Sequence, residues 1–192
     1  MITPVAPQFV TLQQEAGFGD NNQMLRAITM RSGRGGIIWN CGERGATGKL
    51  TPFHDKRVRQ AISYAIDRPS IVKNMVGAFA RPSTGALTPI MRGYVNLGEI
   101  PYDPDRARQL LREAGLPNGF KTRIATTPRY PMGVELAEAV AADLKKVGIE
   151  AAIDVFDWAT MVQYWAGLPP AKNPQEIFIM GAGASTADAD WG

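Results

Sequence analysis

Two kinds of hydrophobic periodicity alternate through the second half of the chain, and this alternation restricts its possible folds more than any other feature. Apolar residues recur every three to four positions over 104–114, and then every second position over 120–126. The same exchange repeats over 136–147 and 149–155, and an apolar run follows at 176–180. Helices that alternate with strands imply crossover connections, so the pattern predicts an α/β fold with a mixed, mostly parallel sheet flanked by helices.

Capping residues indicate where the helices begin and end. Asp55, Asp103 and Asp157 each precede an apolar stripe, where a short carboxylate can accept from the free N–H groups of a first helical turn. Glycines stand just past three of the expected helices, where a positive φ costs them nothing: Gly77, Gly115 and Gly148. We therefore expect helices near 56–66, 69–76, 104–114, 136–147 and 158–165.

The first fifty residues are less regular, because glycines interrupt every candidate element. Segments 27–30 and 37–40 are predicted to be short strands on either side of a glycine-rich turn, with an extended connector as the alternative. Segment 81–102 is rich in Pro and Gly and is expected to be a long loop. The predicted organisation is a connector with the first strands over 1–50 and one α/β unit over 51–192.

Charge and rare residues exclude several classes of protein. The formal net charge is +3 and the cations are dispersed along the chain, which does not predict a nucleic-acid surface. One cysteine, Cys41, cannot form an internal disulfide, and one histidine, His54, cannot build a His-rich metal site. We expect no metal and no cofactor. The chain has no apolar run of membrane-spanning length, and Met1 does not open a signal peptide.

Two further motifs leave an enzymatic alternative open. Segment 42–50 is similar to a phosphate-binding loop, but Glu43 takes the place of its first glycine and Leu50 that of its hydroxyl residue. Asp188 and Asp190 could form a carboxylate pair for metal-dependent hydrolysis, although no third ligand lies nearby in the sequence. A nucleotide-dependent or metal-dependent hydrolase is the alternative function.

Several segments resemble one family when they are taken in order. The run PFHDKRVRQAISYAIDR, at 52–68, closely resembles a block of the family 5 extracellular solute-binding proteins of ABC transporters, the peptide/nickel-binding group. RPSTG at 81–85, PYDPDRA at 101–107, LLREAGLPNGF at 110–120 and ADLKKVGI at 142–149 resemble further family segments in the same order. The resemblance is strong from about residue 50 onward and loose before it.

The resemblance implies a fold and a function. The fold is a lobe of the periplasmic-binding-protein type II class, and a solute would be held in a cleft between two lobes. The implied function is that of the substrate-binding component of an ABC importer, with no catalysis and with membrane permease subunits as partners. The implied location is periplasmic or lipid-anchored extracellular. Since the family's members are about twice this length or more, we expect the chain to be one lobe, cut at its C-terminus. A sensory lobe of a transcription regulator is a further alternative.

The resemblance also implies where a ligand would bind. The family's loop after its last strand presents backbone groups to an extended peptide, and this chain has Gly181, Ala182, Gly183, Ala184, Ser185 and Thr186 there. Ala182 replaces the usual Trp, and Ser185 replaces the Asp that pairs with a peptide's amino group. The run 185–191 is similar to the STGEADW of the glutathione-binding subgroup, with an Ala and an Asp in place of its Gly and Glu. A peptide or peptide-like solute, such as glutathione, is therefore the expected ligand.

Two residues outside this loop complete the expected site. Trp158 matches a family tryptophan that lines the pocket, with core packing as the alternative role. Arg129 follows a predicted strand, at the end where open α/β sheets place their ligands, and could bind a carboxylate bidentately.

Overall fold

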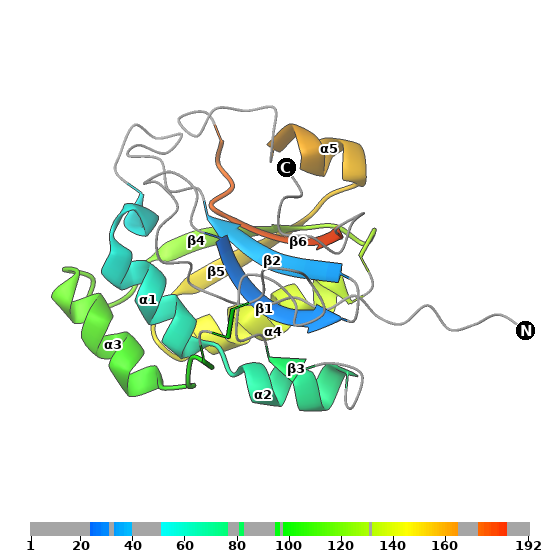
Figure 1. Ribbon diagram of the computed structural model, residues 1–192. Coiled ribbons are helices and arrows are strands. Elements are labelled where there is room, and N and C mark those ends of the chain that lie inside the picture. The colour runs from blue at the N-terminus through cyan, green and yellow to red at the C-terminus, as the bar shows by residue number, and fades with distance from the viewer. Residues whose placement is uncertain are drawn as a thin grey trace, which may run out of the picture.

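The described residues form one mixed sheet with helices on both faces (Figure 1). The computed structural model describes residues 24–30, 33–39, 51–76, 81–82, 95–96, 98–130, 132–164 and 173–183. Its strands are β1 (Met24–Met30), β2 (Gly33–Trp39), β3 (Arg81–Pro82), β4 (Lys121–Thr126), β5 (Glu150–Val155) and β6 (Ile177–Gly183). They lie in the order β3-β1-β2-β6-β4-β5. The predicted α/β class is confirmed.

Three helices begin directly after the aspartates that predict them, whereas the helix expected near 136–147 begins earlier, at Gly133. The helices are η1 (Pro52–His54), α1 (Lys56–Ala65), α2 (Arg68–Ile71) with the π-helical turn η2 (Val72–Val76), α3 (Pro104–Glu113), α4 (Gly133–Lys145) and α5 (Trp158–Val162). The carboxylates of Asp55, Asp103 and Asp157 accept from backbone N–H groups in the first turns of α1, α3 and α5. Gly115 and Gly148 follow α3 and α4 with φ values of +80° and +88°. Gly77 and Trp165 lie outside the described residues.

The direction of strand pairing changes at β6. Strand β4 pairs in parallel with β5 and with β6, as the crossover pattern predicts. Strand β2 pairs antiparallel with β6 and with β1, and β1 pairs antiparallel with β3. The mostly parallel sheet that we expected is thus found only in its C-terminal half, because β1 and β2 form a hairpin instead of crossing over a helix.

Glycines lie within strands where a turn was expected. Strand β2 begins at Gly33 and includes Gly35 and Gly36, so the glycine-rich turn predicted between the first two strands is wrong. Segment 81–102 was expected to be a loop, yet its first two residues form the short strand β3. Pro82 is tolerated there because β3 lies at the edge of the sheet.

The larger core lies between the sheet and three helices. Ile124 of β4 and Ile177 and Ile179 of β6 face it, and all are buried. Helices α1, α3 and α4 contribute most of the other buried side chains: Val58, Ala61, Ile62, Ala65, Ala107, Leu110, Leu111, Leu136, Ala137, Val140 and Leu144. A smaller cluster of Ala125, Phe178 and Met161 lies on the opposite face under α5. Alternate residues of β4 and β6 therefore enter different cores.

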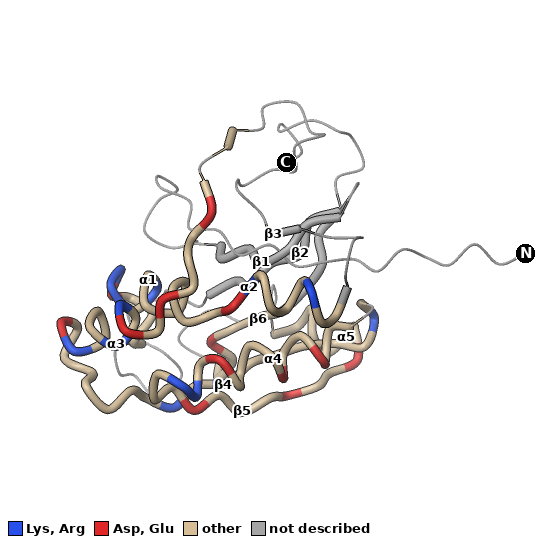
Figure 2. Tube along the Cα trace, turned by 90° about the horizontal axis from the view of Figure 1, so that it is seen from below, with Lys and Arg blue, Asp and Glu red and all other residues tan. Residues whose placement is uncertain are grey.

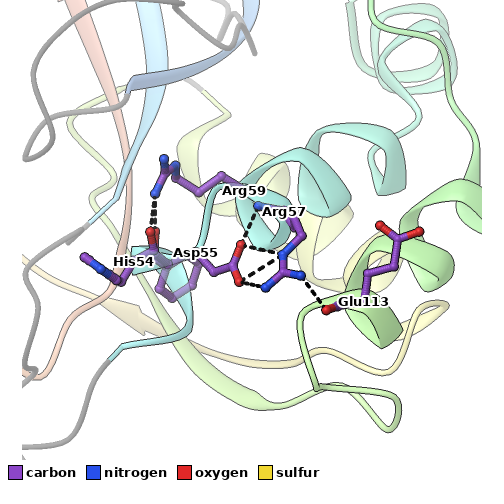
Figure 3. A network of polar contacts seen from close by, with 6 residues as sticks. His54, Asp55, Arg57, Arg59 and Glu113 are labelled. Carbon is purple, nitrogen blue, oxygen red and sulfur yellow. Dashed lines mark hydrogen bonds and ion pairs between the residues drawn. The ribbon is translucent and has the colours of Figure 1, made fainter.

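The segment that carries the strongest family resemblance forms a polar network at the start of α1 (Figure 3). The Arg57 guanidinium binds both carboxylate oxygens of Asp55 and donates to the backbone carbonyl of Glu113 at 2.6 Å. Arg59 is buried and donates to the carbonyls of Phe53 and His54, at 2.6 and 2.9 Å. The network ties the beginning of α1 to the end of α3 and holds η1, so this segment has a structural role.

Two contacts fix the positions of α4 and the loops around it. Asp143 of α4 is buried, accepts from the N–H of Asp67 at 2.9 Å and pairs with Lys146 at 2.7 Å. Gly119 and Gly148 lie so close that a Cβ on Gly119 would be 1.9 Å from the Gly148 carbonyl oxygen. The turns before β4 and β5 can approach this closely only without side chains.

Charges of both signs are interspersed on the described surface (Figure 2). Exposed pairs such as Arg108 with Asp105 and Lys121 with Glu150 join neighbouring positions. In the part of the chain that the structure describes, no helix has the length and apolarity needed to cross a bilayer. The same residues contain no cluster of three or more His, Cys, Asp or Glu side chains that could hold a metal ion.

Candidate functional site

The carboxyl ends of the parallel strands define the candidate site. Strand β4 ends at Thr126 and leads through residues 127–132 into α4, while β5 ends at Val155 and leads into α5. Strand β6 runs parallel to β4, so its carboxyl end lies toward the same edge. Ligands of open α/β sheets bind at this edge.

Two residues that the sequence singles out meet here. The Arg129 guanidinium lies over the Trp158 indole, with its central carbon 4.7 Å from the ring centroid. This distance is that of a cation–π contact. No carboxylate pairs with Arg129 among the described residues. Its side chain is exposed, and Trp158 is half-buried beneath it.

Aromatic side chains extend the site around Trp158. The Tyr130 ring packs edge-on against Trp158, with centroids 5.8 Å apart, and Phe156 stacks on Tyr164 at 4.9 Å. All four rings are partly buried against the small cluster under α5. Burial raises the pKa of the Tyr130 hydroxyl, which therefore stays protonated at neutral pH. The arrangement offers an apolar, aromatic surface with one cation at its rim.

Asp157 holds the helix that carries Trp158. Its carboxylate accepts from the Thr160 N–H at 3.1 Å and from the Thr160 hydroxyl at 2.7 Å. The side-chain hydrogen bond from Thr160 lowers the pKa of Asp157. The cap is therefore charged at neutral pH and sets the direction in which α5 leaves β5.

A polar network on the same face of the sheet was not foreseen from the sequence. Arg123 of β4 donates to both carboxylate oxygens of Asp154 of β5, at 2.8 and 2.6 Å. The buried side chain of Gln175 donates to the same carboxylate at 2.9 Å. This hydrogen bond connects the segment before β6 to β5. The sequence has no local signal for it, because three segments meet only in the folded sheet.

A half-buried carboxylate lies at the amino end of β6. Glu176 accepts from the buried Thr122 hydroxyl of β4 at 2.9 Å. Burial raises the pKa of Glu176, and the Thr122 hydrogen bond only partly offsets this effect. This carboxylate lies at the opposite end of β4 from Arg129, outside the candidate site.

The expected ligand loop begins later than the sequence indicates. Gly181, Ala182 and Gly183 are the last residues of β6 and pair with Gly35, Arg34 and Gly33 of β2. The interpretation of Gly181 as the start of a loop is wrong, because β2 offers the backbone a hydrogen-bonding partner up to Gly183. Ala184, Ser185 and Thr186 lie outside the described residues, as do segment 42–50, Asp188 and Asp190.

Comparison with known proteins identifies the family. The profile of the bacterial extracellular solute-binding proteins, family 5, middle region, matches residues 5–192. The glutathione-binding protein GsiB of Escherichia coli K12 is 34% identical over 140 residues, which cover 73% of this chain and 27% of that protein. The chain thus spans about a quarter of the length of such curated relatives.

Solved structures give the same result. The periplasmic binding protein DppA from Helicobacter pylori, in complex with the peptide STSA, is 32% identical with a TM-score of 0.61. The match covers 70% of this chain and 25% of DppA. AgaA from A. tumefaciens R10, in complex with agropinic acid, is 30% identical with a TM-score of 0.66, over 90% of this chain and 33% of AgaA. The chain belongs to the family 5 bacterial extracellular solute-binding proteins.

Proposed function

We propose that the chain is part of the substrate-binding component of an ABC importer and binds a peptide or peptide-like solute through the residues around Trp158. The observation that carries this proposal is the contact of Arg129 with Trp158 at the carboxyl ends of the parallel strands. The family is one of solute-binding proteins and not of enzymes.

The chemistry of the site favours a solute with a carboxylate and an apolar portion. A guanidinium without a carboxylate partner can donate two parallel hydrogen bonds to a ligand carboxylate. The aromatic rings beside it can pack against the ligand's apolar groups. Glutathione and other peptides with a free C-terminus meet both requirements, and a glutathione-binding protein is among the chain's relatives.

The end of β6 and the residues after it would contact the ligand's backbone. We assign this role to Gly181, Ala182, Gly183, Ala184, Ser185 and Thr186, on the family resemblance. Ser185 would offer a neutral hydroxyl where the family has a carboxylate, so a free amino terminus would be bound less strongly than in other members.

The remaining features of the proposal follow from the family. Residues 51–192 would form most of one lobe, residues 1–50 would supply a connector and the first strands, and a second lobe would close over the solute. Permease subunits in the membrane would receive the solute from a periplasmic or lipid-anchored protein.

The test uses the full-length gene product. We expect thermal-shift screening against glutathione, di- to pentapeptides and opines to give a rise in Tm that grows with ligand concentration. Arg129→Gln should weaken binding of a free-acid ligand by about tenfold or more and leave the ligand's C-terminal amide nearly unaffected. Arg112→Gln, an exposed arginine of α3, is the matched control. Equal losses for acid and amide would contradict the role of Arg129, and no shift with any solute would contradict the proposed function.

A further inference from the structure

The loop that carries Arg129 is closed by contacts between its two ends. Thr126, the last residue of β4, is completely buried and donates its hydroxyl to the Gly133 carbonyl at 3.0 Å. Gly133, the first residue of α4, donates its N–H to the Tyr130 carbonyl at 3.0 Å. The strand end and the helix start are therefore joined across the loop.

Gly133 fits because it has no side chain. A Cβ at this position would lie 2.9 Å from the Thr127 carbonyl oxygen and 3.3 Å from the Thr126 hydroxyl. The first of these distances is shorter than a non-bonded contact allows, and the Thr127 oxygen is backbone that cannot rotate away. Any larger residue would push α4 away from the end of β4.

The backbone between these ends is held in an unusual conformation. Met132 has a φ of +62° and lies in the left-handed region, which non-glycine residues seldom adopt. Such a conformation persists where the surrounding contacts enforce it. The Thr127 hydroxyl lies 3.4 Å from the Arg129 N–H, within reach of a weak hydrogen bond inside the loop.

The contacts of Thr126 and Gly133 matter for Arg129 because its long, exposed side chain has few contacts of its own to hold it. Its aromatic partner, Trp158, belongs to a different segment of the chain. The guanidinium can lie over Trp158 only if the Arg129 backbone stays within reach of α5. We infer that Thr126 and Gly133 are positioning residues, whose hydrogen bond and close packing place Arg129 over Trp158 and so set the preference for anionic solutes. The part of this inference that concerns solutes rests on the proposed function.

The placement of Arg129 can be measured without a ligand. In full-length protein labelled with ¹⁵N- and ¹³C-arginine, the Arg129 side-chain protons should show an upfield ring-current shift from Trp158. Arg129→Lys identifies the signal. Thr126→Val removes the hydroxyl at nearly constant volume and should abolish most of the shift, whereas Thr126→Ser should retain it.

A matched control and a second variant separate positioning from general destabilisation. Thr122→Val removes another buried hydroxyl of β4, one that donates to Glu176, and should leave the Arg129 shift unchanged. Gly133→Ala should reduce the shift through a different contact. Far-UV circular dichroism checks that each variant is folded. An unchanged Arg129 ring-current shift in folded Thr126→Val and Gly133→Ala would overturn the inference. An equally large loss of this shift in Thr122→Val would also overturn it.

Calorimetry with glutathione and its glycinamide derivative distinguishes this inference from the proposed function. If both are correct, the wild type prefers the acid, and Thr126→Val reduces that preference by about three- to tenfold. If Thr126→Val loses the ring-current shift but the wild type binds neither compound or shows no preference, the positioning role stands and its extension to anionic solutes is wrong.

Discussion

The Arg129 guanidinium lies over the Trp158 indole at 4.7 Å, although the two residues follow different strands of the sheet. A guanidinium that contacts a ring with one face keeps its in-plane N–H groups free for another partner. The contact with the indole does not itself occupy these donors, although the neighbouring Tyr130 hydroxyl also interacts with the Arg129 guanidinium.

Trp158→Ala is expected to weaken binding of a carboxylate-bearing peptide by about tenfold or more, because it removes both the cation–π contact and the Tyr130 packing. Trp158→Phe keeps an aromatic face and should weaken binding of the same peptide by only about threefold. Isothermal titration calorimetry on the full-length protein measures both. Wild-type affinity in the alanine variant would mean that Trp158 only packs the protein.

Gly119→Ala should be strongly destabilising, by about 3 kcal/mol or more, because the new Cβ would collide with the Gly148 carbonyl. Gly115→Ala is the control: its φ is +80°, but a Cβ there meets nothing within 4 Å. It should cost only about 1 kcal/mol, from backbone strain alone. Urea denaturation compares the two, and equal costs would show that the turns can move apart.

Asp143→Ala should lower the free energy of unfolding by about 2 kcal/mol, because the Asp67 N–H would lose its acceptor. Asp143→Asn retains an oxygen for that N–H and loses only the ion pair with the half-exposed Lys146. It should cost much less, since such pairs contribute little. Urea denaturation would reveal the opposite ranking if the ion pair were the dominant contact.

Arg68→Met should be neutral or stabilising. The Arg68 side chain is 1% exposed, and its Nε and Nη2 atoms have no hydrogen-bond partner among the described residues. Burial lowers the pKa of Arg68 to about 10, so the group is still charged at neutral pH and its desolvation opposes folding. The Nη1 atom of Arg68 reaches the Ile66 and Ile100 carbonyls only at 3.3 and 3.4 Å. Arg59→Met is the control and should destabilise, because Arg59 holds two carbonyls of η1 at 2.6 and 2.9 Å. A large loss of stability in Arg68→Met would refute this account.

Glu176→Gln should stabilise the protein at neutral pH and have little effect below about pH 4. Burial raises the pKa of Glu176 above its ordinary 4.5, so its contribution to stability is full below that value and is lost as the pH rises through the folded-state pKa. Glutamine keeps an acceptor for Thr122 and avoids the buried charge. Thermal unfolding of Glu176→Gln and of Glu150→Gln, an exposed control, from pH 4 to pH 7 tests the sign. If the difference in Tm between Glu176→Gln and the wild type stayed constant from pH 4 to pH 7, the raised pKa of Glu176 would be disproved.

The helices could be predicted because their signals are local. An aspartate before an apolar stripe caps the helix that follows it, and Asp55, Asp103 and Asp157 all do so. The extent of β2 and β6 could not be predicted, because it depends on the pairing of two segments at opposite ends of the chain. Glycines normally weaken strands, but Gly33 and Gly183 pair with each other, and Gly33 also pairs with Met30 of β1.

The candidate site could be predicted only in part, because some of its residues have local signals and others are placed by long-range contacts. Arg129 and Trp158 could be named from their places after a strand and in a family pattern, and the structure brings them together. The Thr126–Gly133 contact and the Gln175–Asp154 contact have no local signal, because each depends on how separate elements meet. The residues after Gly183 stay a prediction.

Strand β6 joins two halves of the sheet that have no other strand pairing between them. Strands β3, β1 and β2 lie on one side of it and β4 and β5 on the other. Its partner β2 comes from the opposite end of the chain, so this pairing closes a long loop and forms slowly. During synthesis, β2 and β4 therefore lack their shared neighbour until residues 177–183 have left the ribosome, and a strand edge without its partner can pair with another chain.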